Sequence, residues 1–218
     1  MTPYDIPDLS LVVLVGISGS GKSSFAATQF DPFETVSSDV CRGVVSNDPN
    51  LQSATKDAFE LVEFIVAKRL AAGLLTVVDA TNVQPASRKA LVRLAREHDV
   101  LPVAIVLDVP EPICAERNAT RVDRTFGRDV LRRQHQQLTR SMRGLTKEGF
   151  RTVHVLDGVE AIEAAQFVRT PLRSDRREAR GPFDVIGDIH GCDSLLKKIH
   201  KKILNKSKEV KGKKILIY

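Results

Sequence analysis

Residues 16–23 read Gly-Ile-Ser-Gly-Ser-Gly-Lys-Ser, which matches the phosphate-binding pattern G-x-x-x-x-G-K-[ST], the Walker A motif, at every fixed position. The apolar run Leu11–Val15 precedes the match and a helix-like segment follows it, which is the context that the pattern needs. Glycines let successive backbone N–H groups turn toward phosphate oxygens, while Lys22 reaches the β and γ phosphates and the Ser23 hydroxyl binds Mg²⁺. We therefore expect a nucleoside triphosphate to bind at Gly16, Ser18, Gly19, Ser20, Gly21, Lys22, Ser23 and Ser24.

Around this loop, strand-like apolar runs alternate with segments of helical periodicity. The predicted strands are Leu11–Val15, Phe33–Ser38, Leu74–Val78, Leu101–Leu107 and Arg151–Leu156. The predicted helices begin near Lys22 and span Ala54–Ala72, Pro85–His98, Glu111–Arg124, Arg128–Arg143 and Val159–Val168. Continuous apolar strands are buried on both faces, which favours a parallel doubly wound sheet with ligands at the carboxyl ends of its strands. The expected fold class is α/β, a P-loop NTPase fold of the nucleotide-kinase type.

The positive charge of the chain is concentrated at its carboxyl end. The formal net charge is +6, but residues 192–218 alone carry nine lysines against two acidic residues, so residues 1–191 sum to −1. All arginines precede this tail, and the shift in composition indicates a boundary. We expect a kinase-type domain over residues 1–169, a linker over residues 170–181 and a second piece over residues 182–218.

Two aspartates follow predicted strands and are candidates for chemistry. Asp39 can accept the proton of an attacking hydroxyl, and Arg42, three residues on, can anchor an acceptor phosphate. The alternative is an N-cap aspartate beside a solvated arginine. Asp79 directly follows the strand Leu74–Val78. It can hold Mg²⁺ or its water, or it can cap the loop through backbone hydrogen bonds.

The segment from Arg117 to Arg143 is unusually rich in arginine, with eight arginines and only two aspartates. Arg117, Arg121 and Arg124 are spaced to project from one side of a helix, and together they repel unless an anion joins them. This pattern predicts an arginine-rich helical lid that closes over the donor phosphates, with Arg117 and Arg121 in contact with them. The alternative is a solvated face paired with Glu116 and Asp123.

A separate signal lies in Val-Ile-Gly-Asp-Ile-His-Gly at residues 185–191. An apolar strand that ends in Asp-x-His-Gly resembles the way metallophosphoesterases present two metal ligands, here Asp188 and His190. The remaining ligands of such a two-metal site do not follow before Tyr218, so we expect these two to be orphaned. Mn²⁺ would be a cofactor only if that site were complete.

Taken together, four segments resemble the bacterial polynucleotide kinase-phosphatase of RNA repair. They are residues 9–23 (Leu-Ser-Leu-Val-Val-Leu-Val-Gly-Ile-Ser-Gly-Ser-Gly-Lys-Ser), 37–46 (Ser-Ser-Asp-Val-Cys-Arg-Gly-Val-Val-Ser), 76–83 (Thr-Val-Val-Asp-Ala-Thr-Asn-Val) and 116–124 (Glu-Arg-Asn-Ala-Thr-Arg-Val-Asp-Arg). Residues 181–192 are similar to the opening of the family's phosphatase domain, and the lysine-rich tail departs from the family's pattern.

The resemblance implies an ATP-dependent 5′-hydroxyl kinase. By this resemblance, Lys22 and Ser23 bind ATP and Mg²⁺, and Asp39 is the general base on the 5′-hydroxyl. Arg42 contacts the acceptor strand, and Arg117 and Arg121 engage the donor phosphates. It also implies nucleic acid with 5′-OH ends as the partner, RNA as the first choice, and an RNA-repair methyltransferase as a further partner. Phosphatase activity is not expected.

Several matters stay open at this level. A gluconate- or shikimate-kinase-like enzyme and a non-catalytic nucleotide-binding module share the fold, and RNA or DNA preference, the donor base and a homo-oligomer are undetermined. Cys41, Cys114 and Cys192 suit a reducing cytosol and a cytoplasmic location. No signal peptide and no membrane partner are predicted.

Overall fold

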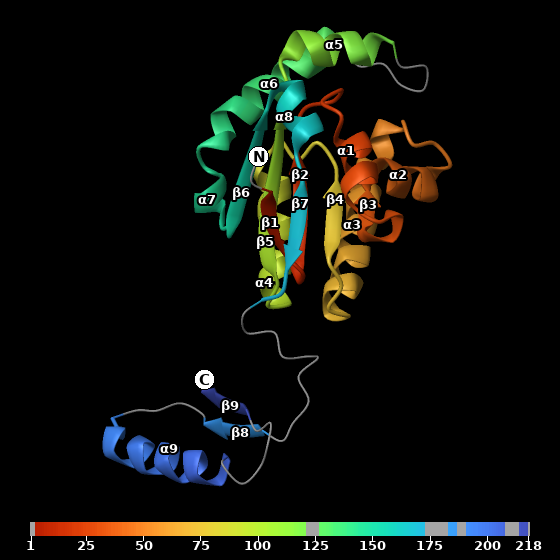
Figure 1. Cartoon of the computed structure of the whole chain (residues 1–218). Helices are drawn as coiled ribbons and strands as arrows, with labels where there is room; N and C mark the ends of the chain where they lie inside the picture. The colour runs from red at the N-terminus through yellow and green to blue at the C-terminus, as the bar shows by residue number, and fades with distance from the viewer. Residues whose placement is uncertain (1–2, 121–126, 173–182, 187–190, 208–213, 218) are drawn as a thin grey trace. The chain divides into compact units, whose positions relative to one another are not determined.

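The computed structural model describes residues 3–120, 127–172, 183–186, 191–207 and 214–217 (Figure 1). Contacts divide the chain into two compact units, Met1–Leu172 and Arg173–Tyr218. We describe each unit by itself. The predicted linker at residues 170–181 overlaps this division, although the last strand of the first unit includes Thr170.

The first unit is built on a five-stranded parallel sheet in the order β3-β4-β2-β5-β6. Its strands are β2 (Ser10–Val15), β3 (Thr35–Ser37), β4 (Thr76–Asp79), β5 (Leu101–Asp108) and β6 (Thr152–Asp157). β2, which leads into the phosphate loop, lies in the centre and is buried throughout, as its unbroken apolar sequence predicts. Because all five strands are parallel, their carboxyl ends meet at one edge, and this confirms the predicted fold class.

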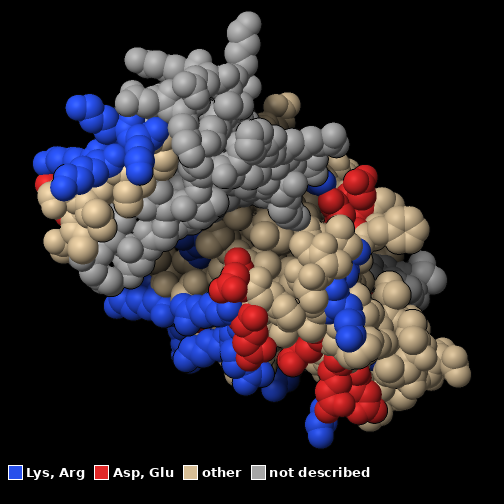
Figure 2. All heavy atoms as spheres, turned by 90° about the horizontal axis from the view of Figure 1, so that it is seen from below, with Lys and Arg blue, Asp and Glu red and all other residues tan. Residues whose placement is uncertain are grey.

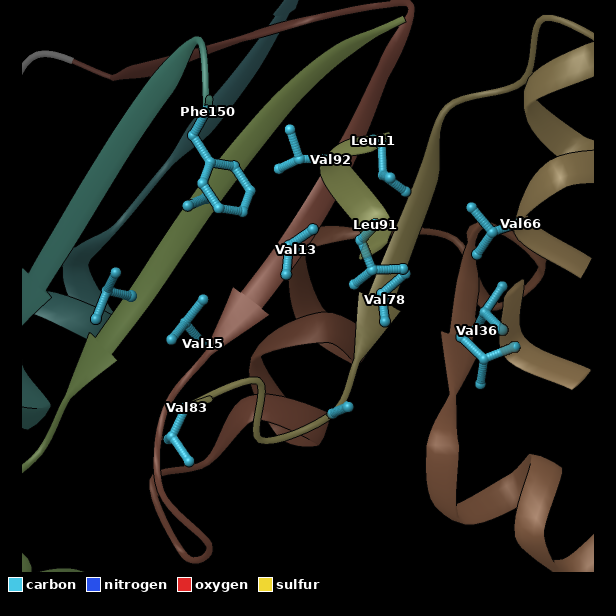
Figure 3. Packing of buried hydrophobic residues seen from close by; sticks show 14 of the residues in the cluster. Leu11, Val13, Val15, Val36, Val66, Val78, Val83, Leu91, Val92 and Phe150 are labelled. Atoms are coloured by element: carbon cyan, nitrogen blue, oxygen red, sulfur yellow. The ribbon is translucent and has the colours of Figure 1, made fainter. Parts of the chain in front are cut away.

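Two apolar clusters cover the two faces of this sheet. On one face, Val13 and Val15 pack with α3 (Thr55–Ala71) and α4 (Pro85–Glu97), to which α6 (Arg128–Met142) and α7 (Leu145–Glu148) add Leu138 and Leu145 (Figure 3). On the other, Val12 and Leu14 pack with α1 (Lys22–Gln29) and Ala165, which follows α8 (Gly158–Ala164). The sheet is therefore doubly wound, and the phosphate loop rests on a core that is packed on both sides.

A second, two-stranded sheet was not predicted. β1 (Tyr4–Pro7) pairs in parallel with β7 (Phe167–Thr170), so the two ends of the first unit lie side by side (Figure 1). The Tyr4 and Phe167 rings stack with centroids 5.1 Å apart, and Phe167 packs edge-on against Phe25 of α1. Each strand is four residues long and only partly buried, which leaves little periodic signal to read.

Several predicted boundaries shift in the structure. The second predicted strand is shorter, because α2 (Ser38–Ser46) begins directly after β3, and Asp39 lies in the first turn of this helix rather than at a strand end. The helix predicted to reach Arg124 is α5 (Glu111–Ala119), and residues 121–126 lie outside the described part. Two short 3₁₀ helices, Pro32–Glu34 and Gln52–Ala54, flank β3 and α2.

The second unit is a strand–helix–strand motif. β8 (Phe183–Ile186) and β9 (Lys214–Ile217) pair in parallel, and α9 (Asp193–Ser207) connects them in sequence. Lys197, Lys198, Lys201 and Lys202 of α9 are exposed, and lysine side chains gather on this helix in the space-filling view (Figure 2). Among the described helices of both units, none is long and apolar enough to cross a bilayer.

Candidate active site

The phosphate loop follows β2 and is held tightly by its neighbours. Gly19 and Gly21 have φ angles of 85° and 89°, in the left-handed region that favours glycine. A Cβ atom at Gly19 would lie 2.5 Å from the Cys114 carbonyl oxygen of α5, so the loop approaches that backbone too closely for any side chain. Gly16 donates its N–H to the Thr81 carbonyl at 3.0 Å, which ties the start of the loop to the segment after β4.

Lys22 is the buried cation of this loop. Its side-chain Nζ donates to the Ile17 carbonyl at 2.8 Å and to the Ser20 hydroxyl at 3.5 Å, and the residue is only 8% exposed. A buried ammonium is costly unless anions or hydrogen bonds compensate it, so this position suits a phosphate ligand. The predicted role of Lys22 is consistent with this placement.

Ser23 and Asp79 come together although they are distant in sequence. The Ser23 hydroxyl donates to Asp79 Oδ2 at 2.7 Å, and Asp79 is 6% exposed at the end of β4. A hydroxyl and a carboxylate are hard oxygen donors of the kind that Mg²⁺ takes beside nucleotide phosphates. The pair therefore fits a Mg²⁺ site, which agrees with the metal-linked interpretation of Asp79.

Asp39 and Arg42 form an ion pair on α2. Arg42 Nη1 donates to Asp39 Oδ1 at 2.7 Å and to the Pro49 carbonyl at 2.8 Å. The Arg42 side chain is 6% exposed and the Asp39 side chain 39% exposed, while the hydroxyl of Ser37 caps the helix. The alternative of an N-cap aspartate with a solvated arginine is therefore wrong: Arg42 is buried, and its Nε makes no hydrogen bond to a described residue.

One cavity of about 680 Å³ joins these groups. Its walls come from the phosphate loop, the start of α2, the Gln52–Thr55 turn, the segment after β4, α5 and α6. The described residues that line it are Ser18, Gly19, Gly21, Lys22, Ser23, Ser24, Ser38, Asp39, Arg42, Gln52, Thr55, Phe59, Asp79, Ala80, Thr81, Asn82, Val83, Gln84, Ser87, Arg117, Val130, Gln134 and Gln137. Gly16 and Ser20, two predicted nucleotide ligands, are not among these lining residues, and Ser20 accepts a hydrogen bond from Lys22.

A buried polar network positions the segment after β4. Asn82, with φ at 48°, donates from Nδ2 to the Leu14 carbonyl at 2.8 Å, and its own carbonyl accepts from Arg88 at 2.7 Å. Arg88 is fully buried and makes two hydrogen bonds, at 2.8 and 2.7 Å, to the Glu148 carboxylate of α7. Sequence reasoning missed this network because its members are 60 and 68 residues apart.

Of the arginines predicted to form a lid, only Arg117 of α5 lies at the described cavity wall, and closure over the phosphates stays a prediction. Arg117 lines the cavity, and its Nη1 lies 3.7 Å from where a Cβ atom on Gly21 would be. Arg121 and Arg124 lie outside the described residues. On α6, the arginines are exposed and absent from the described cavity wall, to which this helix instead contributes Val130, Gln134 and Gln137.

Cys114 lies behind the loop and is not a nucleophile. Burial raises the pKa of its thiol to about 11, although the charges of Lys22 and Arg117 act in the opposite direction. A thiol needs a lowered pKa to react readily, so this cysteine has a packing role. Its backbone carbonyl leaves no room for a side chain at position 19.

The second candidate site is not described by the structure. Asp188 and His190 both lie outside the described residues. Within the described parts of the chain, no group of three or more His, Cys, Asp or Glu side chains is arranged to hold a metal ion. The orphaned phosphatase ligands therefore stay a prediction.

This fold and this site define a P-loop kinase: a parallel five-stranded sheet with a Walker A loop facing candidate acceptor groups across one cavity. A family model described as an AAA domain matches residues 11–145, more than half of the chain. The chain belongs to this family. No curated protein matches it.

Solved structures of several kinases share the fold. A chain of the Pnkp1/Rnl/Hen1 RNA repair complex is 21% identical, with a TM-score of 0.54, over 97% of this chain and 71% of that chain. A gluconokinase from Sinorhizobium meliloti 1021 is 19% identical (TM-score 0.45), over 72% of this chain and 87% of that one. Shikimate kinase from Acinetobacter baumannii, in complex with shikimate, is 14% identical (TM-score 0.45), over 91% and 94%. At these identities the likeness concerns the fold alone.

Proposed function

We propose that the chain is an ATP-dependent polynucleotide 5′-hydroxyl kinase, which transfers the γ-phosphate of ATP to the 5′-OH end of RNA or DNA. The observation that carries the proposal is the single cavity in which Lys22 and Ser23 of the phosphate loop face Asp39 and Arg42 of α2. Phosphoryl transfer depends mainly on positioning and on stabilising charge, and this cavity supplies groups for both.

On the donor side, the loop N–H groups and Lys22 would hold the phosphates of ATP, and Arg117 would reach the same phosphates from α5. Ser23 and Asp79 would hold Mg²⁺, directly or through water, and the ion would neutralise charge on the phosphate oxygens. The position of Lys22 in the cavity wall supports this arrangement.

On the acceptor side, Asp39 would take the proton of the 5′-hydroxyl. The hydroxyl oxygen forms a bond to the γ phosphorus, the bond from that phosphorus to the β–γ bridging oxygen breaks, and ADP leaves. Arg42 donates to Asp39 at 2.7 Å and lines the cavity, so it would orient the base and stand beside an acceptor phosphate.

The choice of a polynucleotide acceptor rests on the resemblance of residues 37–46 and 116–124 to the RNA-repair kinases. The fold shared with a chain of an RNA repair complex is compatible with it. Binding of a polynucleotide acceptor would be held mostly by phosphate contacts and would weaken as salt rises.

A small-molecule acceptor is the second candidate, and one observation favours it. Much of the cavity wall beyond the loop consists of neutral hydroxyl and amide side chains, which suit a polyol: Gln52, Thr55, Asn82, Gln84 and Ser87. A carboxylate on such a molecule would also satisfy Arg42. The acceptor must therefore be tested directly.

The test is transfer of label from [γ-labelled] ATP with Mg²⁺ to 5′-OH RNA, 5′-OH DNA, gluconate and shikimate. We expect label on an oligonucleotide, and we expect Asp39→Ala to lower the transfer rate by roughly 10²–10⁴ if Asp39 is the general base. Asp57→Ala is a matched control, because Asp57 is an exposed aspartate in the first turn of α3 outside the cavity. Label only on a small molecule would replace the proposed acceptor, and ATP binding without transfer would indicate a non-catalytic module.

A further inference from the structure

One hydrogen bond joins α6 to the phosphate loop. The backbone N–H of Ser18 donates to Gln134 Oε1 at 2.8 Å, across 116 residues of sequence. Ser18 is 5% exposed, and both residues line the cavity. Val130, Gln134 and Gln137 are spaced by four and three residues, so they share one face of α6, while Leu131 and Leu138 on an adjoining face are buried.

This hydrogen bond fixes the orientation of the Gln134 amide. A backbone N–H can only donate, so the acceptor oxygen Oε1 must face Ser18, and the Nε2 group with its two hydrogens points elsewhere. Nε2 makes no hydrogen bond to another described residue. Two donors are therefore available at the edge of the phosphate loop, on a side chain that lines the cavity.

We propose that Gln134 is a catalytic residue that donates a hydrogen bond from Nε2 to an oxygen of the transferring γ-phosphoryl group. The inference rests on the proposed kinase function. It makes a neutral amide the phosphate-binding group of α6, where the sequence pattern predicted arginine. In the transition state of phosphoryl transfer, charge is spread over the equatorial oxygens of this group. A donor that is already held in place stabilises that charge without further reorganisation.

The placement of Ser18 determines which phosphate Gln134 meets. Lys22 and Ser23 begin α1, whereas Ser18 lies in the first half of the loop, is bonded to α6 and lines the same cavity. The Gln134 amide, which is hydrogen-bonded to Ser18, therefore adds its N–H donors to those of the phosphate loop. A diphosphate, which lacks the transferring group, would gain nothing from this donor.

The inference is tested by comparing binding of ADP and of adenylyl imidodiphosphate, each with Mg²⁺, by calorimetry. Gln134→Met removes both polar atoms, and Gln134→Glu keeps an acceptor but replaces the donor with a negative charge. We expect wild type to prefer the triphosphate analogue and both variants to lose that preference by roughly tenfold, with little change for ADP. The rate of phosphoryl transfer should fall by roughly 10²–10³, as for the loss of one oxyanion donor.

Gln136→Met is the matched control, because Gln136 is exposed on the same helix and outside the cavity wall. Equal weakening of both nucleotides in the Gln134 variants would overturn the inference, since Gln134 would then only support the loop. Unchanged discrimination would overturn it as well. If wild type bound neither nucleotide, the proposed kinase function itself would fail, and the two failures are thereby distinguished.

Discussion

At the scale of single residues, several candidate catalytic groups are held in place by hydrogen bonds to other side chains or to the backbone. Asp79 receives the hydroxyl of Ser23, and Arg42 is fixed between Asp39 and the Pro49 carbonyl. These hydrogen bonds restrict side-chain rotamers before any substrate arrives, which lowers the entropic cost of reaching the reactive geometry. Conservative replacements should therefore alter rates more than they alter folding.

The cysteines give a residue-scale prediction. Burial raises the pKa of Cys114 to about 11 and also raises that of Cys41, and both thiols are shielded from reagents, whereas Cys192 is exposed. Iodoacetamide at pH 8 should modify Cys192 first, and Cys41 and Cys114 only after denaturation. Mass spectrometry of tryptic peptides over time measures this order. Rapid modification of Cys114 in the folded protein would contradict the packing that we assign to α5 and the loop.

At the scale of elements, the buried pair of Arg88 and Glu148 connects α4 to α7 and holds the segment that follows β4. Through Asn82 it reaches the Leu14 carbonyl, and the neighbouring Thr81 carbonyl holds Gly16 of the phosphate loop. The pair would not touch the transferring phosphate, because it contacts the backbone of the cavity wall rather than a ligand. It nonetheless sets where Asp79 and the loop start lie relative to each other.

Removing one partner of this pair should destabilise the fold. In Arg88→Ala the Glu148 carboxylate, whose side chain is 9% exposed, is left without its partner, and we expect a loss of about 3–5 kcal/mol of unfolding free energy. Urea unfolding followed by circular dichroism measures it. Arg93→Ala is the control, since Arg93 is an exposed arginine of the same helix whose pair with Glu97 spans 3.6 Å, and it should change stability by less than about 1 kcal/mol. Equal effects of the two substitutions would show that the buried pair is not a special constraint.

At the scale of the whole molecule, the first unit contains everything that the proposed reaction uses. Both apolar clusters and the cavity lie within Met1–Leu172, and β1 with β7 closes this unit by pairing its two ends. All of the excess positive charge lies instead in residues 192–218, since residues 1–191 sum to −1. Kinase chemistry and basicity are therefore separable properties of this chain.

This separation predicts that residues 1–172 fold and react alone. A protein ending at Leu172 should unfold at nearly the same temperature as the first transition of the full chain, and its transfer rate on a saturating acceptor should be unchanged. Differential scanning calorimetry and the labelled transfer assay check both. A protein ending at Gln166, which lacks β7 and leaves β1 without its pairing strand, should be less stable. A large loss of stability or rate on ending at Leu172 would show that the second unit supports the first.

Much of this fold could be predicted because its signals are local. The Walker A loop, the apolar strands and the periodic helices each lie within some twenty residues, where spacing alone reports burial and phosphate chemistry. Asp39 and Asp79 could likewise be proposed, because polar residues after buried strands converge in a parallel sheet. Arg42 was proposed from its position three residues after Asp39, and Arg117 from the helical spacing of the arginines. The short strands β1 and β7 could not, since four partly buried residues have no clear period.

Contacts between residues far apart in the sequence could not be predicted in this way. In the sheet, β3 pairs with β4 rather than with β2, and α2 still brings Asp39 into the phosphate cavity. Both features follow from the packing of complete helices on the sheet. The bond from Ser18 to Gln134 spans 116 residues, and that from Arg88 to Glu148 spans 60. Each depends on the final distance between two elements, a sum of many packing interactions that no local pattern encodes. The amino-acid order thus predicted an α/β fold with a Walker A loop, and three-dimensional packing determined which neutral and charged side chains line the cavity beside that loop.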